Sequence, residues 1–116
     1  MEMEPVYFFK TIHADAKRVV LETLEQTLRD KVYHPVDAQK WAATIPELCL
    51  QRLQGLADGH AGFKFIVHVS ILQKKNGGVH TCSAAAWNAE TDGQVVVRYD
   101  TPTLLAAATV YALSLA

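Results

Sequence analysis

Residues 63–87 read FKFIVHVSILQKKNGGVHTCSAAAW. Two runs rich in β-branched and small residues are separated by Lys74-Lys75 and the turn dipeptide Asn76-Gly77, which is the strongest short-range signal for antiparallel strands. In the first run, the odd-numbered residues from Phe63 to Ile71 are apolar and share one side of a strand, so that side is predicted to face the core. Local rules thus predict a hairpin within one chain.

The second run, Val79 to Trp87, differs from the first because small residues occupy both of its faces. Val79, Thr81, Ser83, Ala85 and Trp87 lie on one face, and His80, Cys82, Ala84 and Ala86 lie on the other. Small side chains on both faces indicate that another surface approaches closely. This run is also the predicted site of backbone pairing with a partner strand.

Two more strands are predicted after this stretch. Residues 88–93 have turn composition, and Val95 to Tyr99 alternates as a third strand. The Ala and Leu content of Leu104 to Ala116 would allow a helix. We predict a strand covered on both faces, because the run has no polar face and follows three strands.

Two helices are predicted before residue 63. Apolar residues recur at steps of three and four from about Asp15 to Asp30, as in an amphipathic helix. Asp37 is the expected cap of a second helix that ends near Gly55 or Gly59. Pro46 lies inside it and either kinks the helix or splits it in two. Glu2 to Lys10 shows no clear period, although some of the aromatic side chains of Tyr7, Phe8 and Phe9 are expected to dock.

Composition limits the class of protein. A chain of 116 residues with net charge −1 and no Lys/Arg cluster is typical of one globular domain and disfavours a nucleic-acid partner. Cys49 and Cys82 are too few for a disulfide scaffold or a structural zinc site, which indicates a reduced, intracellular setting. The acidic first residues do not fit a signal peptide, and the uncharged C-terminal run is shorter than the about 20 residues that span a bilayer.

Catalytic groups are sparse. His80 and Cys82 share one strand face and are the nearest approach to a nucleophile pair, but no orienting carboxylate or oxyanion loop lies nearby in the sequence. A packed cysteine beside a strand histidine is the favoured interpretation, and a thiol enzyme stays as a minor hypothesis. The scattered histidines lack the spacing of metal ligands, so no metal and no cofactor are expected.

Several motifs in one order resemble the Tctex-type dynein light chains. They are Phe63 to Val67, Gln73 to Thr81, Trp87, Thr91-Asp92-Gly93 and Val97-Arg98-Tyr99, and Trp41 matches a tryptophan in the second helix of that family. The resemblance implies an α+β fold of two N-terminal helices packed on a four-stranded antiparallel sheet, in a strand-exchanged homodimer. The matching domain would cover residues 13–116, after a partly ordered extension of residues 1–12.

The resemblance also implies a function. Proteins of this kind are non-enzymatic light chains of dynein microtubule motors that bind an extended segment of the dynein intermediate chain by strand addition. Other light chains of the complex and cargo proteins are further expected partners, without nucleic acid or membrane insertion. The expected location is cytoplasmic and cytoskeleton-associated, with a ciliary or flagellar axoneme as a second setting. The alternative is a dimeric peptide-binding adaptor that is independent of dynein.

Carried onto this chain, the exchanged strand is Val79 to Trp87, and the bound segment runs along its free edge, near Phe65 to Leu72. This conflicts with the hairpin that Asn76-Gly77 favours within one chain, and we follow the resemblance. Pro46 and Asn88 depart from the family pattern. The expected partner-binding residues are Phe65, Val67, Val69, Ile71, Val79, His80, Thr81, Cys82, Ser83, Ala84, Ala85 and Trp87.

Overall fold

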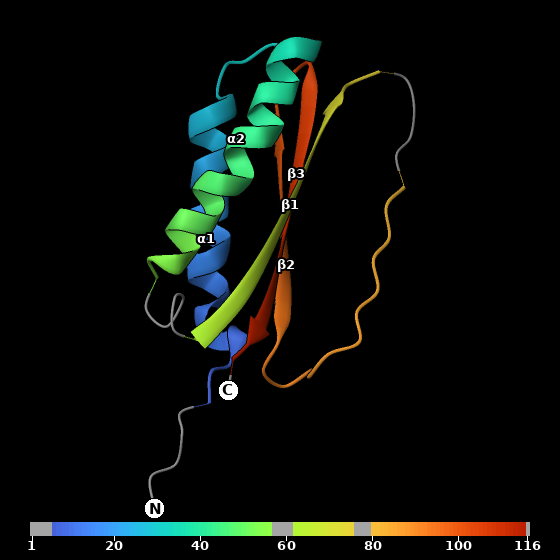
Figure 1. Ribbon diagram of the computed structural model, residues 1–116. Helices are drawn as coiled ribbons and strands as arrows, with labels where there is room; N and C mark the ends of the chain where they lie inside the picture. Colours follow the sequence, from blue (N-terminus) through green and yellow to red (C-terminus); the bar gives the residue numbers. More distant parts are fainter. Residues whose placement is uncertain (1–5, 57–61, 76–79, 116) are drawn as a thin grey trace, which may run out of the picture.

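The structure is a computed structural model that describes residues 6–56, 62–75 and 80–115. Two helices lie side by side on one face of an antiparallel sheet (Figure 1). The predicted α+β class is confirmed. The elements in chain order are α1 (Phe9–Leu28), α2 (Pro35–Gln54), β1 (Phe63–Gln73), β2 (Gly93–Asp100) and β3 (Leu104–Ser114).

The last strand is the centre of the sheet, whose order is β1-β3-β2. Both neighbours pair with β3 in antiparallel fashion, with Val67 of β1 and Val95 of β2 opposite Val110. The predicted strand at the C-terminus is therefore confirmed. Its predicted burial on both faces is not found in this chain: alternate residues from Leu104 to Ala112 are buried under the helices, whereas those between them are only half-buried.

Helix α1 begins at Phe9, earlier than the predicted start near Asp15. Phe9 and Ile12 are 3% and 4% exposed and extend the buried stripe of the helix by a turn and a half. In the sequence, the helical spacing of Phe9 and Ile12 is masked because Tyr7 and Phe8, directly before them, are also aromatic. The expectation that some of these aromatic side chains dock is confirmed, since Phe9 lies in the core and Tyr7 packs against it.

Helix α2 is continuous from Pro35 to Gln54, with Pro46 inside it, so the proline does not split the helix. The helix begins at Pro35, not after a cap at Asp37, because a proline in the first turn has a suitable φ angle and needs no N–H partner. Its end at Gly55 agrees with one of the two predicted positions.

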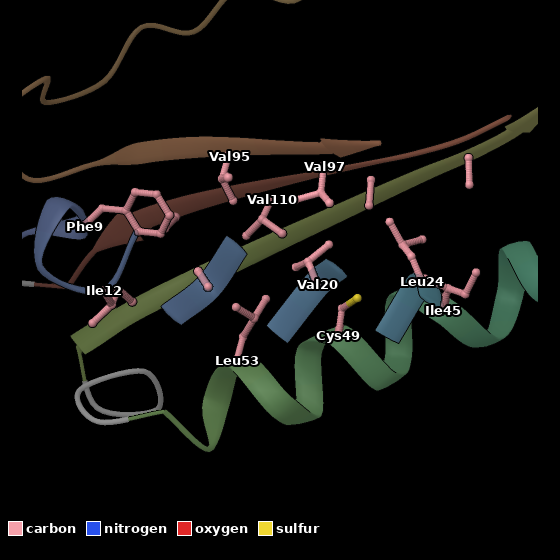
Figure 2. Packing of buried hydrophobic residues seen from close by; sticks show 14 of the residues in the cluster. Phe9, Ile12, Val20, Leu24, Ile45, Cys49, Leu53, Val95, Val97 and Val110 are labelled. Carbon is pink, nitrogen blue, oxygen red and sulfur yellow. The ribbon is translucent and has the colours of Figure 1, made fainter. Parts of the chain in front are cut away.

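Side chains from both helices and from the helix-facing side of the sheet form the core (Figure 2). Val20 and Leu24 of α1 and Ile45 and Leu53 of α2 point toward the strands and are completely buried. Each such side chain stabilises the fold by about 1.5–3 kcal/mol relative to an exposed position. The odd-numbered residues of β1 face this core, as predicted.

The second predicted strand, Val79 to Trp87, is the largest difference between expectation and structure. Residues 80–86 do not form a strand and do not pair with β1, and Val79 lies outside the described residues. The local hairpin is therefore wrong for this chain. The physical reason lies in the sheet order. Among the described strands, β1 pairs with β3 alone, and the chain next joins the sheet at β2, on the far side of β3, so a strand on the open side of β1 would be followed by a segment that crosses both β1 and β3.

Candidate partner-binding site

One edge of the sheet, along β1, is open. Strand β1 pairs with β3 on one side, and no described strand pairs with it on the other. The four predicted site residues on β1 face the helices but are only half-buried, whereas the β3 residues opposite them are buried. The four are Phe65, Val67, Val69 and Ile71, and they pack against the edge of the core.

The opposite edge, along β2, also has no described strand beside it, but its helix-facing side chains are better covered. Val95 and Val97 of β2 are 5% and 4% exposed, because α1 packs over this strand. Apolar side chains at the β1 edge thus keep accessible surface that the β2 edge has already buried. An added strand at β1 would bury more apolar area and would also pair an exposed row of backbone groups.

Residues 80–86, here called the arm, run from the far end of β1 back toward the start of β2 and stand away from the sheet (Figure 1). All seven are exposed, so the predicted site residues of the arm do not contact those of β1 within one chain. These arm residues are His80, Thr81, Cys82, Ser83, Ala84 and Ala85. Trp87, the last predicted site residue, follows the arm and is half-buried.

The base of the arm is held on the outer face of the sheet, the face without helices. The ring of Trp87 meets that of Tyr111 on β3 edge-on, with centroids 6.2 Å apart. A tight turn follows, in which the carboxylate of Asp92 accepts hydrogen bonds from the backbone N–H of Asn88 at 2.9 Å and of Ser114 at 2.7 Å. The end of the arm is thereby joined to the end of β3.

Sequence reasoning missed the role of Asp92. In the sequence, Asp92-Gly93 indicates a turn and forms part of a family motif, and the short bond to Asn88 is predictable from that turn. The bond to Ser114 could not, because it joins residues 22 positions apart.

The chain leaves β1 at a second fixed point. Lys74 donates its backbone N–H to the carbonyl of Thr103 at 2.8 Å, and its ammonium lies 3.1 Å from the carboxylate of Asp100. Both side chains are substantially exposed, so this ion pair contributes at most about 1 kcal/mol. The backbone bond is the firmer contact, and it fixes where the chain leaves the sheet.

The outer face of the sheet also carries exposed apolar side chains among polar ones. Ile66 of β1 and Val96 of β2 are 55% and 52% exposed, and between them the outward residues of β3 are half-buried. Tyr111 pairs with Ile66, and Thr109 pairs with Val96, so these side chains form one continuous surface. Exposed apolar side chains that adjoin one another are one feature of protein interfaces.

The chemistry of the described residues does not point to catalysis. His80 and Cys82 are exposed on the arm, so no packed environment orients the imidazole toward the thiol. Cys49 is the buried thiol, and burial raises its pKa, although a hydrogen bond with Thr23 and the charge of Arg52 act in the opposite sense. A raised pKa keeps this thiol protonated and unreactive near neutral pH.

Two further features bear on ligands. Within residues 6–56, 62–75 and 80–115, no group of three or more His, Cys, Asp or Glu side chains is placed to hold a metal ion. The helices of this part of the chain are not long and apolar enough to cross a membrane.

Comparison with known proteins agrees with this geometry. A model of the Tctex-1 family matches residues 10–113. A dynein light chain Tctex-type from Drosophila melanogaster is 30% identical, over 86% of this chain and 87% of its own length. A dynein light chain Tctex-type 3 from Homo sapiens is 29% identical, over 87% of this chain and 84% of its own length. A dynein light chain Tctex-type from Dictyostelium discoideum is 28% identical, over 71% of this chain and 72% of its own length.

Proposed function

The chain belongs to the Tctex-1 family, the family of the Tctex-type dynein light chains, and from this premise we propose that it acts as a non-catalytic, homodimeric peptide clamp in a dynein motor. Two copies exchange their arms, and each arm then adds a fourth strand to the sheet of the other copy. An extended segment of the dynein intermediate chain pairs with the remaining edge of that strand.

The observation that carries the exchange is the coexistence of an unpaired arm and an unpaired strand edge in one chain. The arm is exposed along its whole length, and β1 offers an open row of N–H and C=O groups along 11 residues. Each is an aggregation hazard alone, and pairing one with the other between two copies removes both hazards. The apolar outer face around Ile66 and Val96 supports the same assembly, because a second copy would cover it.

The same geometry supports the proposed binding of the intermediate-chain segment. A strand added at β1 uses one edge for the sheet, and its other edge remains available to a peptide. Backbone hydrogen bonds supply affinity in this mode, and side chains select the partner. The small residues of the arm, such as Ser83 and Ala84, leave space for the larger side chains of a bound segment.

Dimerisation gives the clamp its strength. Each single peptide contact is weak, but one dimer presents two sites to two intermediate-chain segments that are themselves joined. The second contact then forms at an effective concentration in about the mM range, which raises the overall affinity without any new contact. This requires no catalytic residue, and we propose that neither His80 nor Cys82 acts as one.

Two measurements test this function. Sedimentation equilibrium should give a dimer, and titration with an intermediate-chain peptide should give two equivalent sites per dimer. A monomer at all concentrations, or a dimer that does not bind the peptide, would contradict the proposal.

A dynein-independent adaptor would use the same edge. Affinity purification from the native cell decides between the two, because only the light chain co-purifies with dynein heavy chains. The heavy chains recovered, together with the other light chains and cargo proteins, also distinguish the cytoplasmic motor from the axonemal one. We propose that the protein is found with the microtubule cytoskeleton in either setting.

A further inference from the structure

One carboxylate holds the base of the arm. Asp92 accepts the N–H of Asn88 at 2.9 Å through Oδ2 and the N–H of Ser114 at 2.7 Å through Oδ1. Ser114 is the last residue of β3, and Asn88 follows Trp87 at the end of the arm. The two oxygens of one side chain therefore fix the position of the arm relative to the central strand.

The surrounding turn is rigid for further reasons. The backbone N–H of Asp92 donates to the carbonyl of Asn88 at 2.8 Å, which closes the turn from the opposite direction. Thr91 is 7% exposed, and its carbonyl accepts the N–H of Phe9, the first residue of α1, at 2.9 Å. The base of the arm is thus connected to β3 and α1 as well as to β2, and it cannot shift without breaking these contacts.

This position affects where the arm can reach. The arm leaves the sheet after β1, on one side of β3, and rejoins it at β2, on the other side. Trp87 is held over β3 by Tyr111. From there, the vacant slot outside β1 is two strand spacings away, about 10 Å, and about three extended residues are needed to cover that distance. These residues would come from residues 80–86, so nearly half of the arm would serve as a connection and could not pair with β1 of its own chain.

We propose that Asp92 is the positioning residue for arm exchange. By holding the end of the arm over β3, it makes closure onto the chain's own β1 incomplete and leaves the arm to pair with β1 of a second copy. It opposes the hairpin that Asn76-Gly77 favours locally. This inference rests on the proposed arm-exchanged dimer and assigns the control of that exchange to one side chain.

The test replaces Asp92 and measures the dissociation constant of the dimer by sedimentation equilibrium. D92A should raise this constant at least tenfold. D92N should give a smaller rise, because an amide oxygen accepts one of the two N–H bonds while its NH₂ group opposes the other N–H. The matched control is E90A, an exposed acidic residue in the same turn, which should stay within twofold of the wild type.

A second readout separates positioning from general stability. The dissociation constant compares folded monomer with dimer, so a substitution that only weakens the fold lowers the melting temperature and leaves the constant unchanged. V97A, which removes buried volume from β2, is the control for that case. Hydrogen exchange at the amides of Asn88 and Ser114 should be faster in D92A and D92N, but not in V97A. If D92A does not fold, D92N carries the test.

Two results would count against different claims. A wild-type dimer whose dissociation constant is unchanged in D92A and D92N, despite faster exchange at Asn88 and Ser114, overturns the role of Asp92 alone. A wild-type protein that is monomeric at all concentrations overturns the proposed dimer itself.

Discussion

Arg52 of α2 donates a hydrogen bond of 2.8 Å from Nη1 to the hydroxyl of Thr23 in α1. The same hydroxyl donates to the carbonyl of Val19 at 2.8 Å, so it is satisfied in both directions although Thr23 is completely buried. Cys49 adjoins this pair, and its contact with Thr23 acts to lower the pKa of the thiol, against the larger effect of burial. The two helices are therefore joined by a polar contact inside an otherwise apolar interface.

Thr23→Val tests this contact. Valine keeps the shape of the side chain but removes the acceptor, and the partly buried guanidinium of Arg52 loses its partner. We expect the free energy of unfolding to fall by about 1–3 kcal/mol, the usual cost of an unsatisfied buried group. Urea denaturation measures it, with Thr11→Val as the control, because Thr11 is an exposed threonine on the same helix. Equal stabilities of the two variants would show that the contact contributes nothing.

The buried thiol of Cys49 predicts how stability changes with pH. Its pKa is raised in the folded state, mainly by burial, above the value of 9.0 expected for the unfolded chain. The contribution of the protonated thiol to the free energy of unfolding is therefore fully present below pH 9. It is lost as the pH rises from 9 through the folded-state pKa. Unfolding free energies at pH 7 to 10 should fall more steeply for the wild type than for Cys49→Ala. Parallel curves would contradict this, since all other titrating groups are common to both proteins.

Two glycines differ in the space around them. Gly93 is the first residue of β2, and a Cβ added there would clash with the ring of the buried Phe9. It would lie only 3.0 Å from the Cγ of that ring. At Gly55 the nearest atom would be 3.4 Å away, and the backbone there is helical. We expect Gly93→Ala to lower stability by about 1–3 kcal/mol through overpacking, and Gly55→Ala to be neutral or to raise stability by up to about 1 kcal/mol. Thermal unfolding of the pair checks this, and a melting temperature for Gly93→Ala at or above that of Gly55→Ala would refute it.

Most of the fold could be predicted from the sequence, because local patterns determine it. The alternation in β1 identified its core face, and the lack of any polar face in Leu104 to Ser114 identified the strand that became the centre of the sheet. The effect of Pro46 on its helix could not be predicted in the same way. Whether a proline kinks or splits a helix depends on packing against other elements, and here the half-buried side chain lies in a helix that continues to Gln54.

The candidate site was harder to predict. Its residues were found because their composition is unusual, but composition could not show that the arm stands apart from its own β1. The position of the arm depends on the sheet order, because the segment between β1 and β2 begins on one side of β3 and ends on the other. It also depends on the long-range hydrogen bond from Ser114 to Asp92. Neither feature is written in a local pattern, so the short-range signal of Asn76-Gly77 pointed to the wrong pairing.

Proline substitutions in the arm can assign its two edges. Successive residues of a strand direct their N–H groups to opposite sides, so Thr81 and Cys82 would donate to different neighbours once the arm is paired. Proline removes that N–H, and we expect one of Thr81→Pro and Cys82→Pro to abolish the dimer, while the other keeps the dimer and loses intermediate-chain binding. Sedimentation and peptide titration on each variant give both readouts. Thr81→Ala and Cys82→Ala are the matched controls, because they keep the N–H and should change both constants by less than about twofold, which is below the cost of a lost backbone bond. If both prolines leave dimer and peptide binding intact, residues 81 and 82 pair with neither β1 nor the peptide, and the arm is not the strand that joins them.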